Sequence, residues 1–242
     1  MIEKHLQKLR LRCEIGASEE EAIRAAILGP FDYGPEQIIV RRGEPLTTSI
    51  LLIDGLLARY KDLSNGQRQI THLHVPGDFA DLHGYTLKYL DHNLMSLTPV
   101  RIARMPHAKL DMITDRFPHL TRTFWFSTNL DASIHREWEV SLGRRNAIER
   151  AAHLLCELHS RLLVVGSAEP NRFRLPITQT QFAECLGLTG VHVNRVLREL
   201  REAGLADFRG GVVTIHDRRG LEAVAEFDPL YLYLDGPKNL AA

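Results

Sequence analysis

The segment 178–203 constrains the fold of this chain more than any other part of the sequence. Thr178 opens a capping box, and Thr189 is a second residue of the type that caps helices. Gly187 fits a tight turn between the two helices, and Ala183 supplies the small side chain needed where the helices cross. A generic helical hairpin rarely meets every such requirement, so the segment predicts a helix-turn-helix. The positions that must be apolar in this motif all are: Phe182, Leu186, Leu188, Val193 and Val196.

The exposed side of the second helix carries side chains suited to reading base pairs. In a helix-turn-helix, the N-terminal part of this helix enters the major groove of DNA. There Arg195 can make a bidentate contact with guanine, Asn194 can reach adenine, and Val191 can touch a thymine methyl group. The expected base contacts are Val191, His192, Asn194 and Arg195.

Other residues are placed for contacts with phosphates. Three threonines lie at the predicted helix N-termini, where hydroxyls and unpaired backbone N–H groups favour anions. The run 205–215 predicts a β-hairpin, or wing, whose turn carries an arginine. A further arginine on the second helix either contacts phosphate or pairs with Glu202 one turn later. The expected phosphate contacts are Thr178, Thr180, Thr189, Arg198 and Arg209.

The charge of the chain permits DNA binding without requiring it. Basic and acidic residues both number 30, so the formal net charge is zero. Residues 171–219 contain eight arginines and five acidic residues, which leaves a local excess of three positive charges. Because a solvated charged surface would have a similar balance, this excess alone does not identify a nucleic-acid binder.

Composition argues against several classes of protein. Hydrophobic residues make up 44% of the chain, and the first residues lack the apolar core of a signal peptide. No apolar run approaches the roughly 18 residues of a membrane span. The cysteines, Cys13, Cys156 and Cys185, are too far apart for a disulfide framework or a clustered metal site. We therefore expect a cytoplasmic location, no membrane contact, no metal and no cofactor.

From about residue 31 to residue 105, short β-prone runs alternate with glycine-containing turns. Asn65-Gly66 favours a type I′ hairpin, in which both central residues have positive φ. Regular short strands separated by such turns predict a small β-roll or barrel. Before this region, Ser18 opens a short capped helix that Gly29-Pro30 stops.

The sequence after Pro118 predicts one long helix that dimerises. Residues at alternating spacings of four and three form a stripe along this helix, which is a partial heptad repeat interrupted by polar residues. Such a helix has little domain around it, so a partner helix is an economical cover for its large apolar side chains; packing on the chain's own β-domain is the alternative. The expected dimer-interface residues are Phe124, Ile134 and Trp138. The stripe consists of Leu120, Phe124, Ser127, Asp131, Ile134, Trp138 and Ser141.

These patterns predict an α+β chain in three parts. Residues 1–116 form an N-terminal β-roll sensor domain, and residues 117–145 form the dimerisation helix and hinge. Residues 146–242 form a winged helix-turn-helix domain. Its first helix begins at Asn146, which opens another capping box.

The order of β-roll, long helix, capped helix, helix-turn-helix and wing resembles the Crp/Fnr family of cyclic-AMP receptor and fumarate–nitrate regulators. The resemblance covers about residues 20–217. Its most specific stretches are PGDF at 76–79 and the run 178–205, which contains the tetrapeptide HVNR at 192–195. It implies a cyclic-nucleotide-binding-like roll and a homodimer that regulates transcription from a pseudo-palindromic DNA site. It also implies RNA polymerase as a partner and a small-molecule effector for the roll.

The same resemblance assigns roles by matching position. Arg195 corresponds to the family's base-reading arginine, and Val191 and Asn194 correspond to its other specificity positions. Thr178 and Thr189 fall on phosphate-contacting positions, and the wing arginine falls on the family's wing contact.

The chain departs from the family at the sites where the family's ligands bind. Val191 stands where the family has a glutamate, which puts the usual operator in doubt. A cyclic-nucleotide cassette needs a glutamate after Gly-Asp-Phe and an arginine followed by serine or threonine, but Asp81 and Asp91-His92 stand there. Only Cys13 lies where the oxygen-sensing branch has a cysteine cluster. Neither sensing chemistry is expected to transfer.

Histidines in the roll leave several interpretations open. His72 and His74 share one face of a predicted strand, and further histidines lie near carboxylates. Such groups could bind a metal or an acidic or haem-type effector, or they could be polar groups on a solvent face. A metal-dependent cupin-like enzyme and an effector-binding adaptor are the alternative functions to a non-catalytic DNA-binding regulator. The residues of the expected effector pocket are Asp81, His83, Asp91 and His92.

Overall fold

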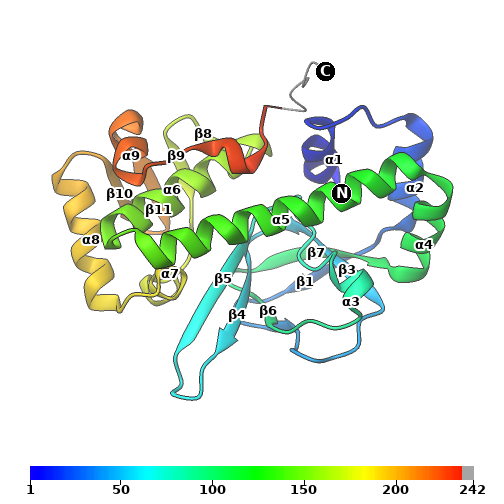
Figure 1. The fold of residues 1–242 in the computed structure, drawn as a ribbon, viewed down its shortest axis with the longest axis horizontal. Coiled ribbons are helices and arrows are strands. Elements are labelled where there is room, and N and C mark those ends of the chain that lie inside the picture. The colour runs from blue at the N-terminus through cyan, green and yellow to red at the C-terminus, as the bar shows by residue number, and fades with distance from the viewer. Residues whose placement is uncertain (236–242) are drawn as a thin grey trace. The chain divides into compact units, whose positions relative to one another are not determined.

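The structure is a computed structural model that describes residues 1–235, and it divides into two compact units. Of the described residues, the first unit contains 1–59, 73–132 and 233–235, and the second contains 60–72 and 133–232. One long helix, α5 (Pro118–Arg144), is continuous through the boundary between the units (Figure 1). No helix in the described part of the chain is both long and apolar enough to cross a membrane.

The first unit contains most of a β-roll with short helices, as the turn pattern predicts; residues 60–72 of the roll belong to the second unit. One sheet has the strand order β1-β7-β3, and the other has the order β2-β6-β4-β5. The strands are β1 (Leu28–Tyr33), β2 (Ile38–Val40), β3 (Thr48–Asp54), β4 (Leu57–Asp62), β5 (Arg68–His74), β6 (Asn93–Ser96) and β7 (Val100–Pro106). The helices are α1 (Glu3–Arg10), α2 (Ala17–Ala26), α3 (Gly84–Leu87) and α4 (His107–Arg116).

Strand β3 is buried on both faces, and its side chains alternate between two core clusters. Leu51 of β3 joins a core cluster with the helices, whereas its neighbours Ile50 and Leu52 join a second cluster with strand residues. Phe124, in the first part of α5, belongs to the helix-side cluster, where its ring meets Phe79 at 6.2 Å and 79°. The roll therefore buries part of α5 by itself.

Two local predictions in the roll are wrong. The connection at Asn65-Gly66 is not a type I′ turn, because Gly66 has a φ of 81° while Asn65 is not among the residues with positive φ. The Asn65 carboxamide instead accepts the backbone N–H of Gln67 at 3.0 Å and closes a longer loop. Helix α2 is capped at Gly16 rather than Ser18, since the Gly16 N–H donates to Glu19 at 3.0 Å.

The second unit is helical with one small antiparallel sheet, whose strand order is β10-β11-β9-β8. Its central helix is α6, which begins where the sequence predicts: the Asn146 side chain accepts the N–H groups of Ile148 and Glu149, both at 3.1 Å. The helices are α6 (Ala147–Val164), α7 (Gln179–Leu186), α8 (Gly190–Glu202), α9 (Arg218–Ala225) and the 3-10 turn η1 (Pro229–Leu232). The strands are β8 (Ala168–Glu169), β9 (Arg172–Arg174), β10 (Ala206–Arg209) and β11 (Val212–Ile215). The α+β class with its helix-turn-helix is confirmed.

Candidate nucleic-acid interface

Helices α7 and α8 form the predicted helix-turn-helix, and both predicted caps are present. The Thr178 hydroxyl accepts the N–H of Gln181 at 3.1 Å, and the Gln181 carboxamide accepts the N–H of Thr178 at 2.9 Å. Gly187 ends α7 with a φ of 62°, a left-handed conformation that glycine adopts at low cost. The Thr189 hydroxyl accepts the N–H of His192 at 3.3 Å and begins α8.

The faces of α8 separate as the apolar pattern predicts. Val193, Val196, Leu197 and Leu200 are buried, whereas Val191 is 84% exposed. Asn194, Arg195 and Arg198 are also exposed, and His192 is half-buried. An apolar side chain exposed to this degree at the first turn of a helix is available to a partner.

The arginines on this face are held by neighbours on the same helix. The Arg195 Nη2 lies 2.8 Å from His192 Nε2, and its Nε lies 3.6 Å from a Glu199 carboxylate oxygen. Arg198 Nε lies 3.9 Å from Glu202, so the structure contains the pairing that the sequence left open. Exposed pairs of this kind add little to stability, and they leave a cation available for phosphate.

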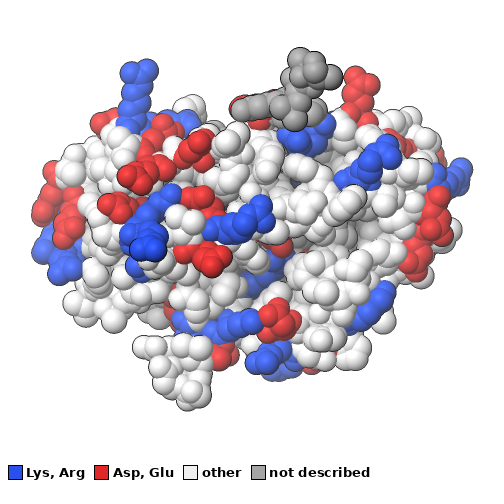
Figure 2. Space-filling view, viewed as in Figure 1, with Lys and Arg blue, Asp and Glu red and all other residues white. Residues whose placement is uncertain are grey.

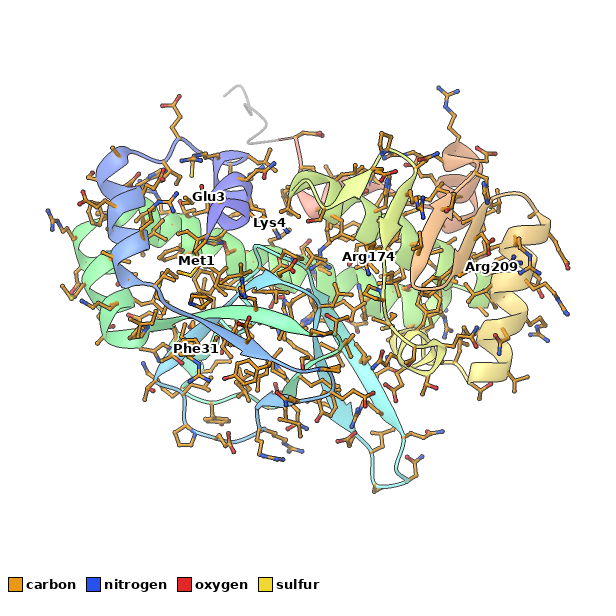
Figure 3. All side chains as sticks on the ribbon, turned by 180° about the vertical axis from the view of Figure 1, so that it is seen from behind. Met1, Glu3, Lys4, Phe31, Arg174 and Arg209 are labelled. Atoms are coloured by element: carbon orange, nitrogen blue, oxygen red, sulfur yellow. The ribbon has the colours of Figure 1, made fainter. Side chains whose placement is uncertain are left out.

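Arginines on two strands are exposed at the wing and beside it. The sequence prediction missed the two on the second strand. Gly210 and Gly211 make the turn with φ of 57° and 73°, and Arg209 before them pairs with Asp207 at 3.2 Å. On the adjacent strand β9, two exposed arginines flank the buried Phe173 (Figure 3 labels one of them and Arg209). Their period of two could have identified them. They are Arg172 and Arg174.

Two further side chains hold the turn of the helix-turn-helix, and sequence patterns do not indicate either. The Gln69 amide, from the β4–β5 hairpin, donates to the carbonyl of Glu184 at 2.7 Å. Arg150 of α6 donates to the carbonyl of Leu186 at 3.1 Å. The last carbonyls of a helix have no partner within it, so both residues supply hydrogen bonds that α7 lacks.

Basic side chains do not form one continuous field on the face shown in Figure 2, where acidic and basic residues are interspersed. This agrees with the formal net charge of zero. Any DNA contact must therefore depend on a few placed arginines and helix N-termini more than on overall charge.

The stripe predicted for dimerisation is instead the inward face of α5. Phe124, Ile134 and Trp138 are 5%, 4% and 6% exposed within a single chain. The indole N–H of Trp138 donates to the buried Glu157 at 3.0 Å. A heptad spacing identifies a buried face without saying what covers it, and here the chain's own side chains cover it. The outward face carries Trp125 and Val140, which are 68% and 48% exposed.

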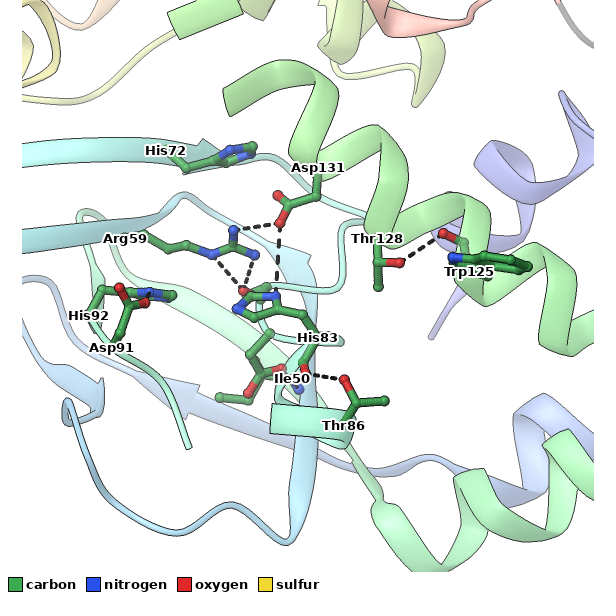
Figure 4. Close-up of polar contacts among 12 residues, drawn as sticks. Ile50, Arg59, His72, His83, Thr86, Asp91, His92, Trp125, Thr128 and Asp131 are labelled. Atoms are coloured by element: carbon green, nitrogen blue, oxygen red, sulfur yellow. Dashed lines mark hydrogen bonds and ion pairs between the residues drawn. The ribbon is translucent and has the colours of Figure 1, made fainter. Parts of the chain in front are cut away.

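The residues predicted for an effector pocket lie around a buried arginine. Arg59 is 1% exposed and donates from Nε and Nη2 to the Ala80 carbonyl at 3.0 and 2.6 Å. Its Nη1 donates to Asp131 of α5 at 2.6 Å, and His83 Nδ1 lies 3.9 Å from the same carboxylate (Figure 4). The guanidinium thus joins the roll to α5 with the protein's own atoms.

The other predicted pocket residues also have partners within the roll. Asp81 is fully buried and accepts the Ile50 N–H at 2.5 Å, and burial raises the pKa of this carboxyl to about 7. His92 is 7% exposed, and its Nδ1 lies 2.8 Å from the exposed Asp91.

The interpretation of the strand histidines as a solvent face is wrong. His72 and His74 are each 1% exposed. His72 stacks on Trp138 at 6.1 Å and 10°, and its Nε2 lies 3.3 Å from Nη2 of Arg161. An imidazole with an aromatic neighbour and a hydrogen-bonding partner can be buried at low cost.

The roll differs from a cyclic-nucleotide site at the position expected to hold the phosphate-binding arginine. This position is Asp91, whose side chain is 69% exposed and carries an acidic group. The one arginine in the roll's interior described above, Arg59, makes three hydrogen bonds to the protein itself.

Known proteins resemble both parts of the chain. The family described as "Cyclic nucleotide-binding domain" matches residues 30–117, and the family described as "Crp-like helix-turn-helix domain" matches residues 149–224. The transcriptional activator protein FnrA of Stutzerimonas stutzeri is 26% identical over 189 residues, which are 78% of this chain and 77% of the relative. The fumarate and nitrate reduction regulatory protein of Salmonella typhi is 24% identical over 189 residues, 78% of this chain and 75% of the relative.

Solved structures share the fold. FixK2 from Bradyrhizobium japonicum has a TM-score of 0.71 and 24% identity, covering 81% of this chain and 96% of that one. The c-di-GMP responsive global regulator CLP of Xanthomonas campestris has a TM-score of 0.66 and 17% identity, covering 84% and 100%.

Proposed function

This chain is a DNA-binding transcription regulator of the Crp/Fnr family, and we propose that it acts as a homodimer on a pseudo-palindromic operator. In this proposal each copy inserts the N-terminal half of α8 into the major groove. Two such helices related by a two-fold axis meet half-sites about 34–36 Å apart, one helical turn of B-DNA.

The observation that carries this proposal is the row of exposed side chains on α8. Val191, Asn194 and Arg195 occupy its outer face while its inner face is buried apolar surface. We assign base reading to these three residues, with Arg195 on guanine. The phosphate contacts are proposed for Thr178, Thr180, Thr189, Arg198 and Arg209.

The outward face of α5 supports the homodimer. Trp125 and Val140 are the exposed large apolar residues of this helix. Arg122, Asn129 and Arg136 are also exposed, and successive members of this set of five are three, four or seven residues apart, so all five share one face. We propose that this face packs against the same face of a second copy.

The roll is proposed as a structural domain, or as a sensor of a ligand other than a cyclic nucleotide. Arg59 and Asp131 already join the roll to α5, and Asp91 would repel a phosphate. Calorimetry with cyclic AMP or cyclic GMP should therefore show no binding at micromolar concentrations. A regulator of this kind acts in the cytoplasm without catalysis, with RNA polymerase as its expected further partner.

Selection of binding sites from random DNA tests the proposed function. The wild-type chain should select an inverted repeat, and Arg195→Ala should lose preference at one base pair in each half-site. Arg201→Ala is a matched control, because this exposed arginine lies in the last turn of α8, away from the reading end. Recovery of the wild-type motif by Arg195→Ala would contradict this placement of the helix, and selection of no motif by the wild type would contradict the function.

A further inference from the structure

We propose that His192 reads no base itself and instead positions Arg195 for the reading of guanine. This inference rests on the proposed function and deepens it. Its basis is the contact of 2.8 Å between Nη2 of Arg195 and Nε2 of His192, which lie three residues apart on one face of α8.

The chemistry of the pair fixes the state of the imidazole. An arginine side chain has donors and no acceptor, so Nε2 of His192 must be the acceptor and the proton must be on Nδ1.

The remaining donors of Arg195 are sufficient for a guanine. Its guanidinium has five N–H groups, of which one faces His192 and the Nε–H faces Glu199 at 3.6 Å. Three N–H groups remain on the two Nη atoms, and a bidentate contact with guanine O6 and N7 needs two. The two neighbours thus hold the side chain from both sides while its outer edge stays available.

Holding the Arg195 guanidinium in place before binding raises discrimination between base pairs. Ordering a long side chain at an interface costs enough to change affinity by roughly three- to ten-fold. If the contact with His192 already orders Arg195 in the unbound protein, affinity rises only for DNA in which Arg195 contacts guanine. Affinity for unrelated DNA should not gain.

The experiment compares four full-length proteins: wild type, His192→Gln, His192→Phe and Arg195→Ala. Glutamine keeps an acceptor, and phenylalanine keeps a ring without an acceptor. Dissociation constants are measured at one pH and fixed salt for three duplexes. These are the site selected by the wild type, the same site with its guanine replaced, and an unrelated sequence.

The ratio of the first two constants is the discrimination. It should fall roughly three- to ten-fold in His192→Phe. His192→Gln should retain the wild-type ratio, and affinity for the unrelated duplex should not fall in either variant.

Wild-type discrimination in His192→Phe, or a loss in His192→Gln as large as that in His192→Phe, would overturn the positioning role. If Arg195→Ala still loses discrimination in that case, the proposed function survives. If the wild type itself shows no discrimination between the duplexes, the proposed function fails and this inference fails with it.

Discussion

The roll and the reading helix use their charged side chains in opposite ways. In the roll, Arg59 and Asp81 are 1% and 0% exposed, and the partners described for them belong to the same unit. On α8, the side chains of Arg195 and Arg198 are 59% and 60% exposed, and each pairs with a carboxylate one turn away. A buried charge must be satisfied inside the protein, whereas an exposed pair contributes little to stability. Roll substitutions should therefore cost stability, and α8 substitutions should cost DNA affinity.

The largest effect is expected at Arg59. Arg59→Met keeps an unbranched apolar stem but removes the donors to Asp131 and the Ala80 carbonyl, so unfolding free energy should fall by about 3–5 kcal/mol. Urea denaturation measures this change. Arg101→Met, which removes an exposed arginine paired with Asp32, is the control and should leave the midpoint nearly unchanged. Equal midpoints for the two variants would contradict the comparison.

The second effect is the pH dependence that Asp81 gives the roll. Burial raises its folded pKa from 3.8 to about 7, so the folded protein holds the proton more tightly than the unfolded chain. The resulting stabilisation is full below about pH 4 and is lost as the pH rises through about 7, with a magnitude on the order of 2–4 kcal/mol.

Unfolding free energies of the wild type and Asp81→Asn between pH 4 and pH 8 test this sign. The wild type should lose stability relative to the variant as the pH rises. Asp32→Asn is the control and should give a curve parallel to that of the wild type in this range, since Arg101 lowers the pKa of Asp32 and any contribution from this exposed carboxylate is lost only below about pH 4. Parallel curves for the wild type and Asp81→Asn would refute the assignment.

A third substitution tests the exposed face of α5, which we propose as the dimer interface. Trp125→Asp should weaken dimerisation by about 1.5–3 kcal/mol, the value of burying one large apolar side chain, without unfolding the monomer. Light scattering across a dilution series measures it. Met112→Asp is the control, because Met112 is 62% exposed on α4, away from this face. A dimer unaffected by Trp125→Asp would place the interface elsewhere.

The smallest effect is expected at the wing. Arg209→Ala should weaken binding to all sequences alike and reduce the slope of log affinity against log salt by about one for each subunit. Its unfolding midpoint should match that of the wild type. A change in the selected DNA motif would show that Arg209 reads bases.

Signals that act over a few residues could be predicted from the sequence, and signals between distant residues could not. The caps at Thr178, Thr189 and Asn146 join a side chain to a backbone N–H two or three residues later, so spacing alone reveals them. Arg59 and Asp131 are 72 positions apart, and Gln69 and Glu184 are 115 apart. No local pattern relates such residues.

The wrong prediction of the dimer-interface residues on α5 has a different cause. Periodicity correctly placed Phe124, Ile134 and Trp138 on one buried face of this helix. It could not say that the covering atoms come from the same chain, as Phe79 and Glu157 show. The type I′ turn failed because the Asn65 side chain competes for the backbone N–H of Gln67, an option that residue type alone does not decide.

The compact unit that contains the helix-turn-helix is interrupted in the sequence, because residues 60–72 belong to it. Gln69 and His72 in this hairpin tip bond to Glu184 and Arg161, so a gene fragment that starts at residue 133 would lack both contacts. A single crossover between the genes of two related regulators therefore cannot transfer the whole of this unit from one parent. A chimaera that takes its C-terminal half from one parent would also need that parent's hairpin tip grafted into the other parent's roll.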